Sequence, residues 1–166
     1  MIKSSSTKAN RIETLIFVES DVKNDPVKRW DLPDHLFFSN GACHILAFAF
    51  LEKYPKLDFA PFWIKPKEDF RGNHIFVANS KLAFDYNGLK EYDLYLADLK
   101  DSMKQHYDNW DFELITLNNS TLVSEEESKT YDGLWLRPPE KFLHNALPRA
   151  RKYLNQFENL EQLLLS

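Results

Sequence analysis

The chain has 166 residues, a formal net charge of −4 and 43% hydrophobic residues, which suffices for one domain with a substantial core. Charges of both signs are interspersed without a basic stripe, so nucleic acid is not an expected partner. No stretch reaches the roughly 18 to 20 apolar residues of a membrane span, and no repeat or low-complexity linker divides the chain. We therefore expect a single soluble domain over residues 1–166 without a membrane partner, in which residues 1–10 are a disordered tail.

The chain contains a single cysteine, Cys43. One cysteine cannot form an internal disulfide, so it is either a small buried hydrophobe or a free thiol with a chemical role. A free thiol is typical of a reducing compartment, which predicts a cytoplasmic protein and leaves secretion as an effector open. The sequence defines no oligomeric state.

The first half of the chain predicts one strand and one central helix. Residues 13–19 form a compact apolar run and are assigned to a buried strand, whereas the Asp, Asn and Pro positions of 20–36 indicate loop or short helical turns. Residues 42–53 favour a helix with a proline just beyond its end, and Ser39 or Asn40 can cap its start. This helix is apolar nearly all round, which predicts that it is buried in the middle of the domain.

The second half predicts strands and amphipathic helices, and with the central helix this gives an α+β fold. Residues 74–88, HIFVANSKLAFDYNG, predict two strands joined by a tight turn at Asn79-Ser80. The remaining predicted elements are, in order, a helix over 92–107, a strand over 112–117, a solvated loop over 124–129, a short strand over 133–139, and a Leu-rich tail that Pro148 divides into a short helix and a longer amphipathic one. The tail is expected to be core or an oligomer contact.

Cys43 falls in the first turn of the central helix, just after Asn40 and Gly41. Unpaired backbone N–H groups and the positive end of the helix dipole favour a thiolate there, and such positions lower thiol pKa values from about 8.5 to roughly 3.5 to 7.5. The N–H groups of this turn, which begins at Ala42, can also bind the oxyanion of a tetrahedral intermediate. The Asn40 side chain is a further candidate donor, with helix capping as its alternative role.

The hairpin supplies the two partners that such a thiol needs. His74 begins the first strand, and its imidazole can take the thiol proton and return it to a leaving group. With the turn at its predicted place, His74 lies directly opposite Asp85, with Cβ atoms about 4.5 to 5.5 Å apart, so that the carboxylate fixes the ring and selects its tautomer. The small Ala78 and Ala83 on the same face leave room for a helix.

The run NGACHILAFAF followed by HIFVANSKLAFDYNG resembles the core of papain-like and transglutaminase-like cysteine enzymes, over about residues 38–88. Those families begin a buried helix with the nucleophilic Cys and place His on one strand of an antiparallel sheet and Asp or Asn on the next. The resemblance implies Cys43 as nucleophile, His74 as general base and acid, and Asp85 as the residue that orients it. HIFV is similar to the His-Ala-Trp-Val of transglutaminase-like domains, whereas the Gln upstream of the cysteine and the aromatic after it in papain-type peptidases are replaced by two phenylalanines and His44.

The function implied is that of a thiol-dependent amide hydrolase or acyltransferase without a cofactor, acting on a protein or peptide through an acyl-enzyme at Cys43. Peptide cleavage, side-chain deamidation and transglutamination share these steps, and a small domain of this kind also fits a toxin or effector. The alternative is a binding module of the same fold with a vestigial triad.

Two further histidines and two tryptophans are the other candidates for a functional role. No metal site is expected, because no Cys pair or His-Glu-x-x-His motif accompanies the histidines His35, His44 and His74. His44 as a rival base is disfavoured, since neighbours on a helix diverge by about 100° and do not face one partner. Trp63 and Trp135 are either lining of a substrate groove or packing residues.

Overall fold

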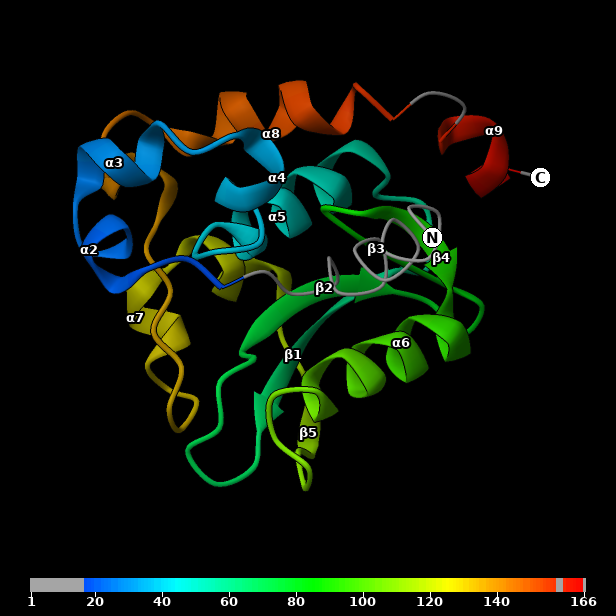
Figure 1. Ribbon diagram of the computed structural model, residues 1–166. Helices are drawn as coiled ribbons and strands as arrows, with labels where there is room; N and C mark the ends of the chain where they lie inside the picture. The colour runs from blue at the N-terminus through cyan, green and yellow to red at the C-terminus, as the bar shows by residue number, and fades with distance from the viewer. Residues whose placement is uncertain (1–16, 158–159, 166) are drawn as a thin grey trace, which may run out of the picture.

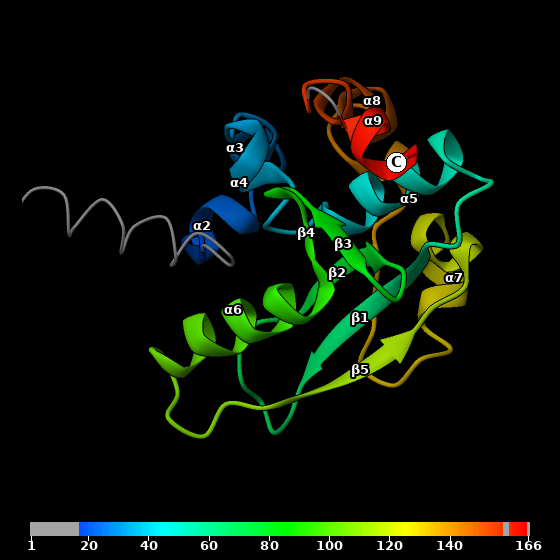
Figure 2. The ribbon, with the colours of Figure 1, turned by 90° about the vertical axis from the view of Figure 1, so that its right-hand side faces the viewer.

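The computed structural model describes residues 17–157 and 160–165 and shows an α+β fold, a five-stranded antiparallel sheet with helices on both faces (Figures 1 and 2). The sheet order is β4-β3-β2-β1-β5. The strands are β1 (Ala60–Pro66), β2 (His74–Ala78), β3 (Leu82–Asp85), β4 (Gly88–Glu91) and β5 (Phe112–Thr116). The predicted tail at 1–10 and residues 13–16 of the first predicted strand lie outside the described residues, and residues 17–19 form no strand.

Short helices precede and follow the two long ones that cover the sheet. The helices are α2 (Ser20–Lys23), α3 (Pro26–Trp30), α4 (Asp34–Phe37), α5 (Cys43–Lys53), α6 (Tyr92–Lys104), α7 (Glu125–Ser128), α8 (Ala146–Leu154) and α9 (Leu160–Leu165), with 3-10 turns η1 (Asn119–Val123) and η2 (Pro139–Lys141). The helical turns predicted for 20–36 and the helices predicted for 42–53 and 92–107 are confirmed. The loop predicted at 124–129 contains α7, and residues 133–138 are not assigned to a strand.

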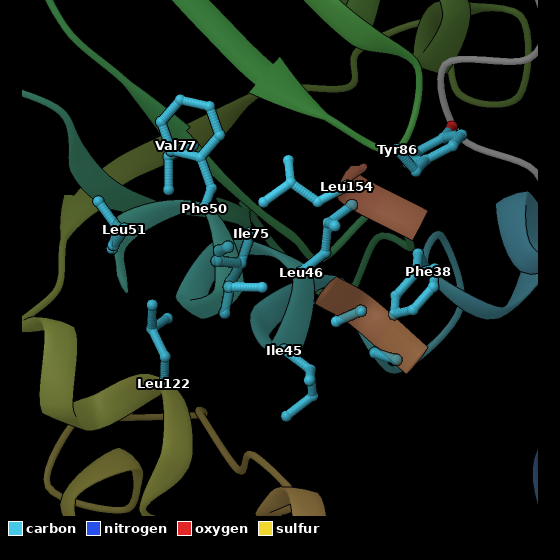
Figure 3. Close-up of a cluster of buried hydrophobic side chains, with 14 of the residues drawn as sticks. Phe38, Ile45, Leu46, Phe50, Leu51, Ile75, Val77, Tyr86, Leu122 and Leu154 are labelled. Atoms are coloured by element: carbon cyan, nitrogen blue, oxygen red, sulfur yellow. The ribbon is translucent and has the colours of Figure 1, made fainter. Parts of the chain in front are cut away.

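The central helix α5 packs against one face of the sheet, as its apolar surface predicts. Its side chains meet Ile75 and Val77 of β2, and they form one core with residues from η1 and α8 (Figure 3). Helix α6 covers the opposite face, where Phe76 and Ala83 lie in a second apolar cluster. The prediction that the small alanines leave room for a helix is therefore confirmed, and that helix is α6, with Tyr95 and Leu99 in the same cluster. Helix α5 packs on the other face, whose larger side chains offer more apolar area to bury.

The interior strand β1 was not predicted from the sequence. It lies between β2 and β5, with Trp63 opposite Ile75 on one side and Ile115 on the other. Two prolines obscure it in the sequence, because proline cannot donate to a β-ladder. Pro61 is the second residue and Pro66 the last, so both stand near the ends of the strand, where a missing donor costs little.

The β2–β3 hairpin has a different register from the predicted one. Val77 pairs with Phe84 and Ala78 with Ala83, because the side chain of Asn79 accepts the N–H groups of the two residues that complete the turn, at 2.9 and 2.7 Å. The turn thus lies one residue later than expected, and the register shifts by two. A shift of two residues leaves every side chain on its predicted face, because strand side chains alternate with period two.

The C-terminal part of the described chain runs alongside α5 and α4 (Figure 1). The prediction that Pro148 divides it is wrong: Pro148 lies in the first turn of α8, where a helix needs no N–H donor, and the Asn145 side chain caps this turn by accepting the N–H of Leu147 at 3.0 Å. Among the described residues, no helix has both the length and the apolar character to cross a membrane.

Arg149 of α8 fixes the N-terminal helices to the core. Its guanidinium donates to the carbonyl oxygens of Trp30 and Leu32, both at 2.7 Å, and to the carboxylate of Asp34 at 2.9 Å. It also lies 4.0 Å from the ring centroid of Phe37. One side chain thus donates to two carbonyl groups and a carboxylate, and it links two parts of the fold that are more than a hundred residues apart in the sequence.

We expect Arg149→Lys to lower the free energy of unfolding by about 2 kcal/mol, because an ammonium cannot reproduce the planar fork of donors and leaves carbonyl oxygens unpaired. Arg151→Lys is the matched control, since this neighbouring arginine is half exposed and its main partner is Glu52 at the surface, a contact worth at most about 1 kcal/mol. Urea unfolding of both variants measures the difference. Equal stabilities would contradict the proposed role of Arg149.

Candidate active site

Cys43, His44 and His74 line one cavity of about 250 Å³ at the N-terminal end of α5. Trp63 and Trp135 line it as well, so both lie where the groove alternative placed them, Trp63 buried and Trp135 half exposed. The other residues around the cavity are Arg29, Gly41, Asn73, Ile75, Gly133, Leu134, Leu136 and Arg137. The segment predicted as a last strand is therefore a wall of the cavity.

Helix α5 starts as the sequence predicts, but Asn40 does not cap it. Ala42 is the N-cap residue, and its carbonyl accepts the N–H groups of Ile45 and Leu46 at 3.1 and 3.3 Å. Asn40 is buried and its amide nitrogen donates to the Leu36 carbonyl at 3.1 Å, which draws it toward the preceding helix. The first N–H groups of a helix have no carbonyl one turn earlier to donate to. The backbone N–H groups of Cys43 and His44 are therefore free of helical hydrogen bonds and face outward from the helix end.

His74 and Asp85 form a buried pair, as predicted. Nε2 of His74 lies 3.1 Å from Oδ2 of Asp85, and the two side chains are 0% and 2% exposed. Tyr95 of α6 donates its hydroxyl to the same carboxylate oxygen at 2.8 Å, and the backbone N–H of Asn87 donates to the other oxygen at 2.8 Å. The carboxylate therefore has its donors fixed by a strand, a helix and a turn.

The second ring nitrogen of His74 is available to the thiol. Nδ1 is buried and makes no hydrogen bond within the described part of the chain, while Tyr86 packs its ring against the imidazole edge, with centroids 5.7 Å apart. Cys43 and His74 are near enough for each to shift the pKa of the other.

The charges of this site favour a thiolate next to an imidazolium. Burial alone raises the pKa of the Cys43 thiol, but the neighbouring rings of His44 and His74 outweigh it and lower the pKa to about 5. Burial lowers the pKa of His74, but the hydrogen bond to Asp85 and the nearby Cys43 raise it to about 10. Burial and the Asp85 charge also raise the pKa of Tyr95, which keeps its hydroxyl a donor.

His44 lies closer to the site than helix geometry predicted. Its Nε2 is held 2.7 Å from the Arg137 carbonyl oxygen, and its ring still lowers the pKa of Cys43. The contact with Arg137 is the buried hydrogen bond of a structural histidine, although the ring lines the same cavity as Cys43, which lies off the end of the helix. His44 has a neutral carbonyl as partner, whereas His74 has a carboxylate, so the imidazolium form is favoured at His74.

Three polar residues of the cavity were not identified from the sequence. Arg29 and Arg137 come from distant segments, and no local pattern marks them. For Asn73, the only indication in the sequence was its position directly before His74. The Asn73 side-chain oxygen accepts the indole N–H of Trp63 at 3.0 Å, so its amide nitrogen, a donor, is turned away from the tryptophan.

Comparisons with protein-family models, with curated proteins and with solved structures found no match. Within the described residues, no three or more His, Cys, Asp or Glu side chains form a group that could hold a metal ion. His35 is exposed on α4 and is not among the residues that line the cavity.

The pKa shifts predict the pH dependence of thiol alkylation. An alkylating reagent reacts with the thiolate, and a thiol with a lowered pKa keeps its reactivity above that pKa and loses it as pH falls through it. We expect the iodoacetamide rate of Cys43 to fall with a midpoint near pH 5 and the midpoint to rise in His74→Gln. A wild-type midpoint above pH 8 would contradict the ion pair.

Asp85→Asn and Tyr95→Phe separate the charge of the carboxylate from its support. Asn keeps the shape but removes the charge that holds the imidazolium, so the alkylation midpoint should rise clearly. Phe removes one donor and keeps the charge, so the midpoint should move much less, although each variant loses about 1 to 3 kcal/mol of stability from a broken buried hydrogen bond. Rates across pH and thermal melts are the measurements. Lower stability with unchanged midpoints would make Asp85 a structural residue.

Proposed function

We propose that this protein is a thiol-dependent amide hydrolase or acyltransferase with a papain-like or transglutaminase-like mechanism, acting on a protein or peptide amide. One observation carries the proposal: a buried His74–Asp85 pair leaves one ring nitrogen to Cys43, a thiol of low pKa on the wall of a cavity. A cytoplasmic location, which keeps the thiol reduced, belongs to this proposal.

The reaction begins with the Cys43 thiolate attacking the carbonyl carbon, whose π electrons move to oxygen. The tetrahedral intermediate then collapses: the C–N bond breaks, and the imidazolium of His74 gives its proton to the leaving amine. A thioester on Cys43 remains. Water, or a second amine in the acyltransferase case, attacks this thioester while His74 takes its proton, and the C–S bond breaks to regenerate the thiolate.

The oxyanion requires donors that face the cavity. The backbone N–H of Cys43 at the start of α5 is one. Asn73 fits the second position better than Asn40, because Asn73 lines the cavity while Asn40 donates to Leu36. Ala42 contributes to oxyanion binding only indirectly, as the N-cap residue of the helical turn that presents the Cys43 N–H.

A binding module with a vestigial triad is the second candidate. The half-exposed Trp135 at the cavity favours it, because exposed aromatic side chains are common in protein interfaces. The two candidates differ in one respect: only the enzyme needs a thiol that forms an acyl intermediate.

Acyl-enzyme formation is testable without the natural substrate by using p-nitrophenyl acetate. The thiolate displaces nitrophenolate and is acetylated, so we expect a burst of one equivalent of nitrophenolate per protein chain at neutral pH. The burst should be lost in Cys43→Ala and Cys43→Ser and slowed at least about a hundredfold in His74→Gln. Stopped-flow absorbance gives the burst, and intact-mass spectrometry gives the acetylated protein.

Thermal melts of the two cysteine variants serve as the control. Cys43 is only partly buried, so both should remain within about 1 kcal/mol of the wild type. A Cys43→Ser variant much less stable than Cys43→Ala, together with no burst in the wild type, would identify a packing cysteine and refute the enzyme.

A further inference from the structure

Two arginines, Arg29 and Arg137, lie in the lining of the cavity beside Cys43. No Asp or Glu is among the described residues that line it. Burial, and then the charge of Arg137, lower the pKa of Arg29, so the two like charges act on each other. This arrangement departs from the chain as a whole, whose formal net charge is −4.

An adjoining cavity of about 200 Å³ extends the cationic lining. It shares Gly41 and Asn73 with the first, and it adds Lys23 and Arg71, again without a carboxylate among the lining residues that the structure describes. Burial and the charges of Arg71 and Arg29 lower the pKa of Lys23. Basic groups from α2, α3 and the segment before β2 thus converge on one side of the site.

Within the described part of the chain, no carboxylate neutralises these cations. None of the salt bridges within the described chain involves Lys23, Arg29, Arg71 or Arg137. A terminal N–H group of Arg29 donates a hydrogen bond to the Lys23 carbonyl. The buried Nε of Arg29 has no hydrogen-bond partner within the described residues. Buried charged groups without a counter-charge are unfavourable, and an anionic ligand would relieve both the repulsion and the unpaired donor.

We propose that the acyl donor used by Cys43 carries an anionic group, a carboxylate or a phosphate, which binds Arg29 and Arg137 beside the reacting carbonyl. The inference rests on the proposed function and names its substrate class. Guanidinium groups match such anions with paired, charge-assisted hydrogen bonds. The bound anion orients the substrate within the cavity, so its binding energy positions the carbonyl carbon at the thiolate.

The test compares iodoacetate with iodoacetamide. In both reactions the thiolate displaces iodide and forms a thioether, so the ratio of the two rate constants cancels the thiolate fraction and reports only the preference for a negative charge. We expect the wild-type ratio to exceed that of glutathione at equal ionic strength. Arg29→Gln and Arg137→Gln should each lower it about threefold to tenfold, as expected for one nearby charge, and Arg29→Lys should keep most of it.

Arg151→Gln is the matched control, because it removes the same charge from an arginine that pairs with Glu52 and lies outside both cavities. Its ratio should equal that of the wild type. Fast iodoacetamide labelling with a ratio that neither cavity variant changes would overturn the anion inference and leave the proposed function intact. Slow labelling by both reagents would overturn both.

A second measurement uses only the wild type and so does not depend on whether a variant folds. Inorganic phosphate and acetate are added separately at constant ionic strength, and the rate of iodoacetamide labelling is followed. Protection by phosphate assigns a phosphorylated acyl donor, and protection by acetate assigns a carboxylate. Protection by neither anion would overturn the inference.

Discussion

The buried pair of His74 and Asp85 is the interaction on which the rest of the site depends. A carboxylate with 2% of its side chain exposed is stable only when donors surround it. Here they come from β2, from Tyr95 on α6 and from the backbone after β3. The sheet and the helix on its far face therefore act together to present one ring nitrogen to the cavity.

The two faces of the sheet have separate roles. Helix α5 brings Cys43 to one end of the sheet and is buried there among Ile75, Val77 and other apolar side chains. Helix α6 contributes no residue to the cavity lining, but through Tyr95 it holds the carboxylate that orients the histidine. Cys43 and Asp85 are thus supported by different packing layers, and His74 lies where they meet.

The C-terminal part of the chain completes the site from outside the sheet. Residues 133–137 form a cavity wall, and the carbonyl of Arg137 fixes the His44 ring. Arg149 binds the carbonyl of Trp30, the residue after Arg29, and so holds the end of α3 beside the cavity. The cationic lining is therefore assembled from both ends of the described chain, and it requires the complete fold.

The sequence by itself determined on which side of a single helix or strand each side chain lies. The run of helix-favouring residues after Ser39 and Asn40 placed Cys43 at a helix start, and the two-residue period of strands placed His74 and Asp85 on one face even though the predicted turn was one residue off. Only the tertiary structure decided which sheet face α5 covers, that β1 lies between β2 and β5, and that Arg29 and Arg137 meet at the thiol. Local periodicity is set by backbone geometry and is legible in any short window. Contacts between distant segments depend on how all apolar faces are buried together, which no single window encodes.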